Sequence, residues 1–532
     1  MKPGASRGTP VRKGPKAMGT AMRDVRVVDV IVVGAGPVGL WLAAELRRVG
    51  VDVLVLEKLV EPSPHTKALT ILPRSLELFA MRGLAERFLA VGRQLPTYHF
   101  ALLENRLDFT ILDTPFPFAL FLPQPKTEAL LREHVQELGV PVLAGHTVRG
   151  VRQQDDLVVV EAETAEGSAT FAARWVVGCD GPSSIVRKSA GIGFLGTPTT
   201  MRVAVGDVRL ADPPAVPALT LNRDNGALFL AALGDGRYRV SPFDHDTIFR
   251  PEDDSLTLDE LRASTIRVAG TDFGMYDPGY LIKFGNATLQ AETYRRDRVL
   301  LAGDAAHIHM PLGGQGMNLG LADAGNLAWK LAAVIHGWAR PELLDSYHGE
   351  RHRIGQRVVE DTRAQAALVT ATGLDGSALR ARFNKMLADH PSLNRELAER
   401  LAGVDVAYRS PADENPLVGR RMPDLPLTGT PAPSVFGLLR QVRFVLLDLT
   451  GGLLAERFTG LSPALDVACA SELVTATRPE WQGVGAVLLR PDGHIGWVGP
   501  DASAESVASL PRALARWLVA MPTPRGSTTV RP

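Results

Sequence analysis

The sequence predicts an α/β protein of more than one domain, built around a parallel sheet with helices packed on its faces. Its 532 residues exceed the size of a typical single domain. The run Val27–Val33 is apolar and rich in β-branched residues, which is typical of a buried strand, and a glycine-rich turn and a helical pattern follow it. Similar passages from strand to helix occur at residues 174–187 and 300–330. Strands that alternate with helices in this way favour a parallel sheet.

The first of these passages has the pattern of a dinucleotide-binding turn. The turn consists of Gly34, Ala35, Gly36, Pro37, Val38 and Gly39. In such a turn the first glycine allows a tight bend, the second lets the backbone approach a pyrophosphate, and the third allows close helix packing. A second apolar run, Val51–Leu56, ends in Glu57, where an acidic side chain can accept hydrogen bonds from ribose hydroxyls. We therefore predict a bound dinucleotide; the alternative is a glycine-rich turn without a ligand.

The passage from Leu300 to Lys330 indicates which dinucleotide is bound. Asp304 follows a strand end, and a glycine-rich loop then leads to a helix that we expect to begin near Gly316. A carboxylate can accept hydrogen bonds from a polyol, while a helix N-terminus offers unpaired N–H groups and the positive end of a dipole. Reduced FAD combines a sugar-alcohol chain with a ring that becomes anionic, so the two features together predict FAD.

The middle passage ends a strand in Asp180 and Gly181, and Ser183 and Ser184 follow. Two interpretations of this turn stay open. It can place Asp180 beside the cofactor, or it can be an ordinary strand-to-helix turn in which Ser183 or Ser184 caps the helix.

The three motifs, in this order between Val27 and Arg353, resemble the FAD-dependent aromatic hydroxylases, the family typified by para-hydroxybenzoate hydroxylase. Shorter matches resemble the polyketide and phenolic-compound hydroxylases of actinobacterial type; they lie at Pro73–Glu77, Leu122–Gln124 with Glu128, and Leu343–Tyr347 with Glu350 and Arg351. The resemblance implies a Rossmann-like FAD-binding domain, an inserted antiparallel sheet that holds the substrate, and a thioredoxin-like C-terminal domain.

The resemblance also assigns roles to individual residues. The expected cofactor-binding residues are Gly34, Gly36, Pro37, Val38, Gly39, Glu57, Lys58, Lys67, Gln124, Asp180, Asp304, Gly316, Met317 and Asn318. Lys67 stands where the family has an arginine, which keeps the charge but loses the bidentate fork. Pro311 is expected beside the flavin ring and His309 as a proton acceptor, although a histidine in this loop can equally be structural. The expected substrate contacts are Phe229, Tyr238 and Phe243.

The implied reaction is a monooxygenation. NADPH reduces FAD, O2 adds at the flavin C4a carbon, and the resulting hydroperoxide transfers one oxygen atom to a polycyclic aromatic substrate of polyketide type. Baeyer–Villiger oxygenation of a polyketide ketone on the same fold is an open alternative. A non-catalytic flavin- or polyketide-binding protein is a second alternative, from another functional class.

The expected domains follow from shifts in pattern along the chain. Residues 1–26 form a basic tail that we expect to be disordered, and residues 27–200 with 298–356 form the FAD-binding domain. Residues 201–297 form the inserted sheet, 357–410 a helical connector, and 411–532 the C-terminal domain. A final helix is expected near Pro511–Leu518, with the proline in its first turn. The C-terminal domain lacks a CxxC motif, so we expect it to have a structural role or to contact a second copy in a homodimer.

Composition limits the remaining function classes. The formal net charge is zero, so no overall field attracts nucleic acid or an anionic membrane. No apolar run reaches the roughly 18 residues that span a bilayer. Two cysteines without metal-ligand spacing indicate reduced thiols, and we expect no metal site and a cytoplasmic location.

Overall fold

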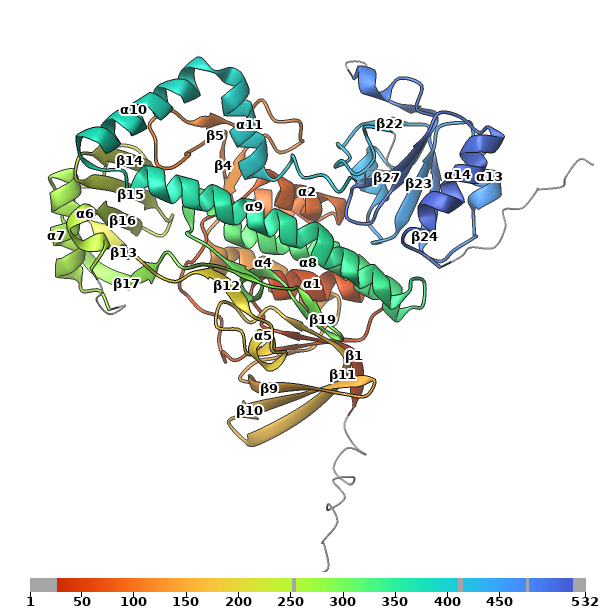
Figure 1. The fold of residues 1–532 in the computed structure, drawn as a ribbon, viewed down its shortest axis with the longest axis horizontal. Helices are drawn as coiled ribbons and strands as arrows, with labels where there is room; N and C mark the ends of the chain where they lie inside the picture. The colour runs from red at the N-terminus through yellow and green to blue at the C-terminus, as the bar shows by residue number, and fades with distance from the viewer. Residues whose placement is uncertain (1–25, 251–254, 410–414, 475–477, 520–532) are drawn as a thin grey trace, which may run out of the picture.

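The computed structural model describes residues 26–250, 255–409, 415–474 and 478–519. Apart from Arg26, the predicted basic tail lies outside the described residues. Figure 1 shows a central α/β body crossed by two long helices, with an antiparallel sheet at one end and a small separate domain at the other. Among the described helices, none is long and apolar enough to cross a membrane.

A parallel sheet forms the centre of the molecule, as the sequence predicts. Its strands lie in the order β20-β11-β1-β2-β8, and all four neighbouring pairs are parallel. Their bounds are β1 Val27–Val33, β2 Val53–Leu56, β8 Val142–Leu143, β11 Gly167–Gly178 and β20 Val299–Leu301. Antiparallel strands extend the sheet, with β19 (Arg295–Arg296) beside β20, and β9 (Thr147–Gln154) and β10 (Leu157–Thr164) beyond β11. Residues 30–33 of β1 are buried, which explains their apolar sequence, since parallel sheets are covered on both faces.

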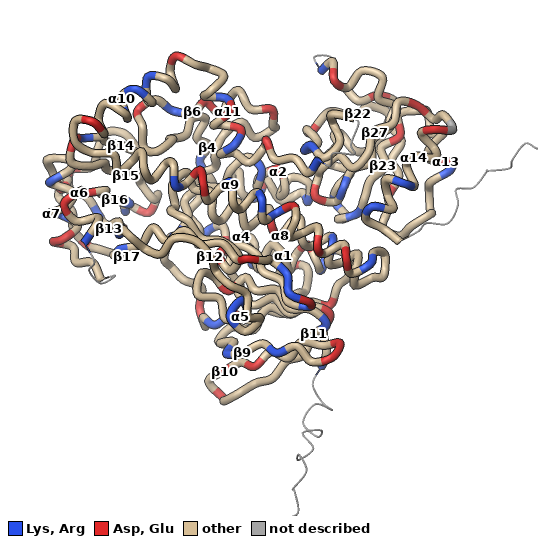
Figure 2. The backbone as a smooth tube through the Cα atoms, in the orientation of Figure 1, with Lys and Arg blue, Asp and Glu red and all other residues tan. Residues whose placement is uncertain are grey.

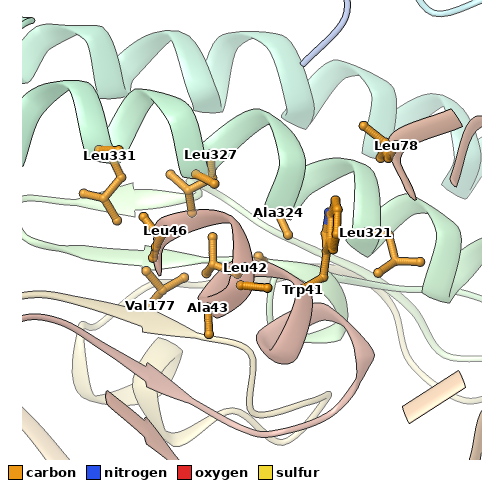
Figure 3. Packing of buried hydrophobic residues seen from close by; sticks show 14 of the residues in the cluster. Trp41, Leu42, Ala43, Leu46, Leu78, Val177, Leu321, Ala324, Leu327 and Leu331 are labelled. Carbon is orange, nitrogen blue, oxygen red and sulfur yellow. The ribbon is translucent and has the colours of Figure 1, made fainter. Parts of the chain in front are cut away.

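Two helices cover the sheet and start at its carboxyl edge. They are α1 (Pro37–Arg48) and α8 (Gln315–Ile335). Figure 3 shows them packed against each other through Trp41, Leu42 and Leu46 on one side and Leu321, Ala324, Leu327 and Leu331 on the other. Gly320 makes this approach possible, because a Cβ there would lie 2.6 Å from the Val38 side chain and 3.0 Å from the Gly303 Cα.

The inserted sheet is antiparallel and has the strand order β14-β15-β16-β13-β17. Its bounds are β13 Arg202–Leu210, β14 Ala218–Arg223, β15 Gly226–Ala232, β16 Tyr238–Asp244 and β17 Met275–Gly285. Residues 224–225 connect β14 to β15 and residues 233–237 connect β15 to β16, so the three strands follow one another as antiparallel hairpins. Helix α7 (Leu258–Ala269) packs on one face and begins with a capping box formed by Thr257 and Glu260. Three small sheets lie outside the central and inserted sheets. The first contains β3 (Thr70–Ile71), β7 (Ala119–Phe121) and β4 (Arg93–Leu95), and the second contains β5 (Thr97–Tyr98) and β6 (Leu107–Asp108). The third contains β12 (Phe194–Thr197), β18 (Thr288–Ala291) and β21 (His307–Ile308).

The remaining helices of the first 250 residues are α2 (Pro73–Met81), α3 (Ala85–Leu89), α4 (Gln124–Glu137), α5 (Ile185–Ser189) and α6 (His245–Ile248). Two further short helices, α12 (Val435–Leu438) and α13 (Ala455–Phe458), belong to the C-terminal domain. The connector contains α10 (Gly373–Asp389) and α11 (Pro391–Ala402). Helix α9 (Asp345–Val369) is continuous through residues 356 and 357, where the sequence pattern suggested a domain boundary.

The C-terminal domain contains a four-stranded sheet in the order β24-β23-β26-β27. Its strands are β23 Phe444–Asp448, β24 Leu465–Cys469, β26 Ala486–Leu489 and β27 Ile495–Gly499. The pair β23–β24 is parallel and the other two pairs are antiparallel, which is the thioredoxin-like arrangement. The prediction for the last helix was wrong: α14 spans Ala504–Leu514, and Pro511 lies inside it. The helix starts earlier because the Ser503 side chain caps it by accepting a hydrogen bond from the Ser506 N–H.

Buried ion pairs join the C-terminal domain to α8 and α9. Arg490 donates to both carboxylate oxygens of Glu350 at 2.8 Å and to Asp492 at 2.6 Å. Trp329 of α8 donates to Asp492 at 3.1 Å, and Lys330 donates to Glu350 at 2.8 Å. Burial lowers the pKa of Lys330 to about 8. In contrast, Figure 2 shows charges of both signs interspersed over the rest of the chain.

We expect the variant Asp492→Asn to lower the free energy of unfolding by about 2–4 kcal/mol, because it leaves Arg490 buried with only one carboxylate partner. Chemical denaturation monitored by circular dichroism measures the change. Asp466→Asn is the matched control: its ion pair with Arg443 is exposed, so its cost is expected to stay within about 1 kcal/mol. Equal effects of the two variants would contradict a stabilising role for the buried interface.

Candidate functional site

A cavity of about 960 Å³ opens at the carboxyl edge of the central sheet and extends to the inserted sheet. Its lining comes from three parts of the fold: the ends of β1, β2 and β11, the loop between β20 and α8, and the face of the inserted sheet that α7 does not cover. Ligand sites in open α/β sheets occur at this edge. The volume is at the upper end of the roughly 300–1,000 Å³ that is typical of ligand pockets.

The three glycines of the dinucleotide-binding turn have different structural roles. Gly34 has a φ of +105°, and a Cβ there would lie 2.4 Å from the Cys179 carbonyl oxygen. A Cβ on Gly39 would lie 2.0 Å from the Gly34 carbonyl oxygen, so this glycine lets α1 pack on the turn. A Cβ on Gly36 would meet nothing within 4 Å, because Gly36 faces the open cavity. Gly36 is also the N-cap of α1 and no side chain caps that helix, so its first N–H groups have no side-chain partner there.

Glu57 is held at the end of β2. Its carboxylate accepts hydrogen bonds from the Ala35 N–H at 2.7 Å and from the Leu59 N–H at 2.9 Å. A carboxylate has about four acceptor positions, so capacity remains for hydroxyl donors from a ligand. Lys58 also lines the cavity, with an exposed side chain.

Asp304 lies in the loop after β20 and lines the cavity without a partner. Within the part of the chain that the structure describes, its carboxylate accepts no hydrogen bond and forms no ion pair. Its side chain is open to the cavity, but the surrounding protein desolvates it and so raises its pKa. A carboxylate that opens on a cavity with all its acceptor positions free can accept hydrogen bonds from the hydroxyl groups of a ligand. This is the position at which the sequence predicted contact with a polyol.

The N-terminus of α8 opens on the same cavity. Gly313 and Gly314 have φ values of +73° and +66°, and no side chain caps the helix. Gly316 and Met317, in the first turn, line the cavity. Asn318 is not part of the described lining, because each helical residue turns by about 100° and carries it to another face. Its side chain binds the Leu72 N–H, the Thr70 carbonyl and the Gly314 carbonyl and so fixes the loop.

Asp180, Gln124 and Lys67 all line the cavity. Asp180 accepts hydrogen bonds from the Ser184 hydroxyl at 2.5 Å and from the Ile185 N–H at 2.7 Å, and burial raises its pKa. Ser184 is the N-cap of α5, so the capping interpretation of this turn is correct for Ser184. Gln124 accepts from the Ala68 N–H and donates to Glu128 at 2.6 Å. Burial raises the pKa values of Asp304 and Glu128, and the positive charge of Lys67 opposes part of that rise.

Two histidines of the loop before α8 differ in their surroundings. His307 does not line the cavity; its Nε2 lies 2.6 Å from a carboxylate oxygen of Asp323 on α8. His309 lines the cavity beside Pro311, and its Nδ1 lies 2.9 Å from the Met310 carbonyl oxygen. Burial lowers the pKa of His309 to about 4, so its ring is neutral near pH 7. Its Nε2 is buried without a partner among the described residues.

The inserted sheet supplies an apolar wall. Phe229 and Phe243 line the cavity, with Val205, Ile282 and Phe284. Tyr238 is not among the described lining residues, because side chains alternate along β16 and place Tyr238 on the face that packs against α7. Arg239 lines the cavity, but Asp207 pairs with it through two hydrogen bonds of 2.8 Å.

The sequence did not identify several lining residues. They include Tyr98, His99, Leu102, Arg239 and Tyr280. Side chains alternate between the two faces of a strand, so Arg239, four residues before Phe243, could have been predicted to lie on the same face of β16 as Phe243. The segment that carries Tyr98, His99 and Leu102 has no periodicity that would indicate its position.

The chain is similar to proteins that are named as tetracycline-pathway monooxygenases and as a dialkyldecalin synthase. It is 41% identical over 504 residues to the 12-dehydrotetracycline 5-monooxygenase/anhydrotetracycline 6-monooxygenase of Streptomyces rimosus, which covers 92% of this chain and 98% of the relative. It is 37% identical over 482 residues to the dialkyldecalin synthase of Streptomyces rugosporus, which covers 90% of this chain and 97% of the relative. The solved structure of an anhydrotetracycline hydroxylase from Streptomyces rimosus matches with a TM-score of 0.84 at 39% identity, covering 93% of this chain and 99% of that one.

Two family models cover most of the chain. The model of an FAD binding domain matches residues 27–362, and the model of the aromatic-ring hydroxylase C-terminal domain matches residues 415–520. These matches confirm the predicted fold class. The chain therefore belongs to the FAD-dependent aromatic hydroxylases of the para-hydroxybenzoate hydroxylase type, a family of monooxygenases.

Proposed function

We propose that this protein uses FAD and NADPH to insert one oxygen atom from O2 into a polycyclic aromatic substrate of polyketide type. The observation that carries the proposal is a cavity in which two helix N-termini without side-chain caps and the carboxylate of Asp304, which has no partner among the described residues, adjoin an apolar wall. FAD has a matching set of groups: a pyrophosphate, a ribityl chain and a ring that becomes anionic on reduction.

Each part of the cofactor has residues that fit it. Gly36, Pro37 and Val38 at the start of α1 would hold the pyrophosphate, since the backbone there is open and the helix dipole favours an anion. Glu57 would accept hydrogen bonds from the adenosine ribose, with Lys58 beside it. Asp304 would accept hydrogen bonds from the ribityl hydroxyls. FAD bound there supplies the redox chemistry, taking a hydride from NADPH and activating O2 for transfer of one oxygen atom.

The protein contributes electrostatics and placement. Gly316 and Met317 at the start of α8 would face the flavin pyrimidine, where free N–H groups stabilise negative charge. Asn318 would keep that turn in position through its three backbone hydrogen bonds. Pro311 would contact the flavin ring, and its fixed φ would limit movement of the loop. Lys67, Gln124 and Asp180 would complete the cofactor contacts.

The substrate would lie against the inserted sheet. Phe229 and Phe243 provide aromatic contact there, and such contact suits a flat polycyclic ring system. The tetracycline-type substrates named for the two hydroxylating relatives are polycyclic, which supports this choice.

Two other outcomes are chemically distinct. In a Baeyer–Villiger reaction the oxygen enters beside a ketone and the product is a lactone or an opened ring. The relative named as a dialkyldecalin synthase belongs to a different reaction class, so membership of the family does not by itself fix the reaction.

The test is NADPH oxidation by the purified, FAD-loaded protein with and without polycyclic phenols and quinones, with product masses recorded. Substrate-stimulated oxidation and a gain of one oxygen atom in an aromatic product are expected. A lactone product would show Baeyer–Villiger oxygenation instead of hydroxylation. A product of unchanged mass would indicate a cyclase or a binding protein. A protein that takes up no FAD after reconstitution would overturn the proposal.

We expect Asp304→Asn to weaken FAD binding roughly 10- to 100-fold, because a neutral amide replaces a charged hydrogen-bond acceptor. Fluorescence titration of the apoprotein with FAD measures the dissociation constant. Asp156→Asn, at an exposed ion pair, is the control and should bind FAD as the unaltered protein does. Unchanged affinity in Asp304→Asn would remove this residue from the cofactor site.

We expect the substrate-dependent rate to show no change with pH that comes from His309 between about pH 6 and pH 8. The pKa of about 4 keeps the His309 ring neutral over that range. The pH profile of kcat/KM for the unaltered protein and for His309→Asn measures this. A group that titrates near pH 6.5 in the unaltered protein and is missing from the variant would show instead that His309 changes charge during turnover.

A further inference from the structure

One wall of the cavity comes from neither the central nor the inserted sheet. Residues 98–106, which we name the strap, contribute Tyr98, His99 and Leu102 to the lining. Ala101 and Leu102 have φ values of +48° and +56°, although neither is glycine and both are buried. Such a backbone is unfavourable for residues other than glycine and persists only where the surroundings impose it.

Three separate elements hold the strap in this conformation. Asn222 of the inserted sheet donates to the Leu102 carbonyl oxygen at 2.7 Å. Gln365 of α9 accepts from the Ala101 N–H at 3.3 Å. Asn384 of α10 accepts from the Asn105 N–H and receives the Asn105 side-chain N–H at its carbonyl, both at 2.8 Å. The strap is therefore a fixed part of the cavity wall.

His99 is the polar side chain that the strap presents to the cavity. Its ring stacks on Tyr98 at a centroid distance of 4.9 Å and lies 5.9 Å from the ring of Phe229. Among the described residues, the Nδ1 of His99 is a buried atom without a hydrogen-bond partner, and its Nε2 does not belong to that group of atoms. Because the residue lines the cavity and is otherwise enclosed, Nε2 is the ring nitrogen that a ligand can reach. Burial, with the charge of Arg106 adding to it, lowers the pKa of His99 to about 3.

Among the described lining residues, neither the strap nor the inserted sheet contributes an unpaired cation. The guanidinium of Arg239 is paired with Asp207, and Arg106 donates to the Thr220 hydroxyl and does not line the cavity. Lys67 also lines the cavity, where its charge acts on Asp304. Burying a carboxylate without a cationic partner is costly, whereas a hydroxyl or carbonyl needs only a hydrogen bond.

We infer that His99 orients the substrate by a hydrogen bond from or to its Nε2, and that the site accepts uncharged polycyclic phenols or quinones in preference to carboxylated ones. The inference rests on the proposed function for the identity of the site. A neutral imidazole nitrogen can donate to a carbonyl oxygen or accept from a hydroxyl, depending on its tautomer. Both groups occur in hydroxyquinones, so either tautomer allows the contact.

The first experiment measures binding of two probes that share one ring system. Chrysophanol carries a methyl group where rhein carries a carboxylate, and both are dihydroxyanthraquinones. Each is titrated into the FAD-loaded protein, and the dissociation constant is taken from the change in flavin absorbance. We expect chrysophanol to bind at least about tenfold more tightly than rhein. Equal or tighter binding of rhein, or binding of neither probe, would overturn the preference for uncharged substrates.

The second experiment tests His99 itself. His99→Phe keeps a ring that can stack on Tyr98 but removes the hydrogen bond, and we expect it to weaken chrysophanol binding about 3- to 10-fold. His99→Gln places an amide near the position of Nε2 and should recover at least half of that loss. His390→Phe, on the exposed surface at the start of α11, is the matched control and should bind chrysophanol as the unaltered protein does. Unchanged binding by His99→Phe, or no recovery in His99→Gln, would overturn the role of His99.

FAD content and thermal stability are measured for every variant, so that a folding defect is recognised. These data also separate the two proposals. If the unaltered protein takes up no FAD, the proposed function fails and the inference fails with it. If FAD is bound and the product gains one oxygen atom, but His99→Phe binds chrysophanol normally, only the inference fails.

Discussion

The carboxylate of Asp323 holds together the elements on which the cavity depends. It is buried on α8 and accepts hydrogen bonds from Arg351 Nε at 2.7 Å and from the Gly303 N–H at 3.3 Å, and His307 Nε2 lies 2.6 Å away. Burial alone would raise the pKa of Asp323, but the charges of Arg351 and His307 outweigh that effect and lower it. The carboxylate is therefore ionised, and it fixes the Asp304 loop, α8 and α9 relative to one another.

This arrangement explains why Asp304 and the α8 N-terminus face one space. Gly303 turns the chain at a φ of +64° immediately before Asp304, and its N–H donates a hydrogen bond to Asp323 of α8. Gly320 allows the same helix to lie against Gly303 and Val38. The two helix N-termini and the carboxylate thus reach the same cavity, and within the described part of the chain no side chain binds them that a ligand would first have to displace. Preorganisation of this kind lowers the cost of binding a ligand.

The parts of the site that the sequence predicted are those whose chemistry is local. The glycine spacing, Glu57 and Asp304 each follow a strand directly, so their position at the carboxyl edge of the sheet follows from the pattern itself. Tyr238 and Asn318 were misplaced with respect to the cavity because their faces depend on the periods of a strand and a helix, and one residue of offset reverses or rotates the side chain. His99 had no such signal. Its position depends on Asn222, Gln365 and Asn384, which lie more than a hundred residues away in sequence.

The C-terminal domain bears on the same site through charge. Arg351, which binds Asp323, also donates to the Tyr408 hydroxyl at 3.0 Å, and the Tyr408 ring lies beside Arg490 and His494 of the C-terminal domain. Its neighbour Glu350 binds Arg490 from the same turn of α9. Two adjacent residues of one helix therefore join the domain interface to the anchor of the Asp304 loop. Buried ion pairs are weak sources of net stability but demand one geometry, because any displacement leaves a desolvated charge unpaired. The domain has no dithiol of its own and does not line the cavity within the described residues. Its contacts reach the site through α9, where Glu350 binds Arg490 and the adjacent Arg351 binds both Tyr408 and Asp323.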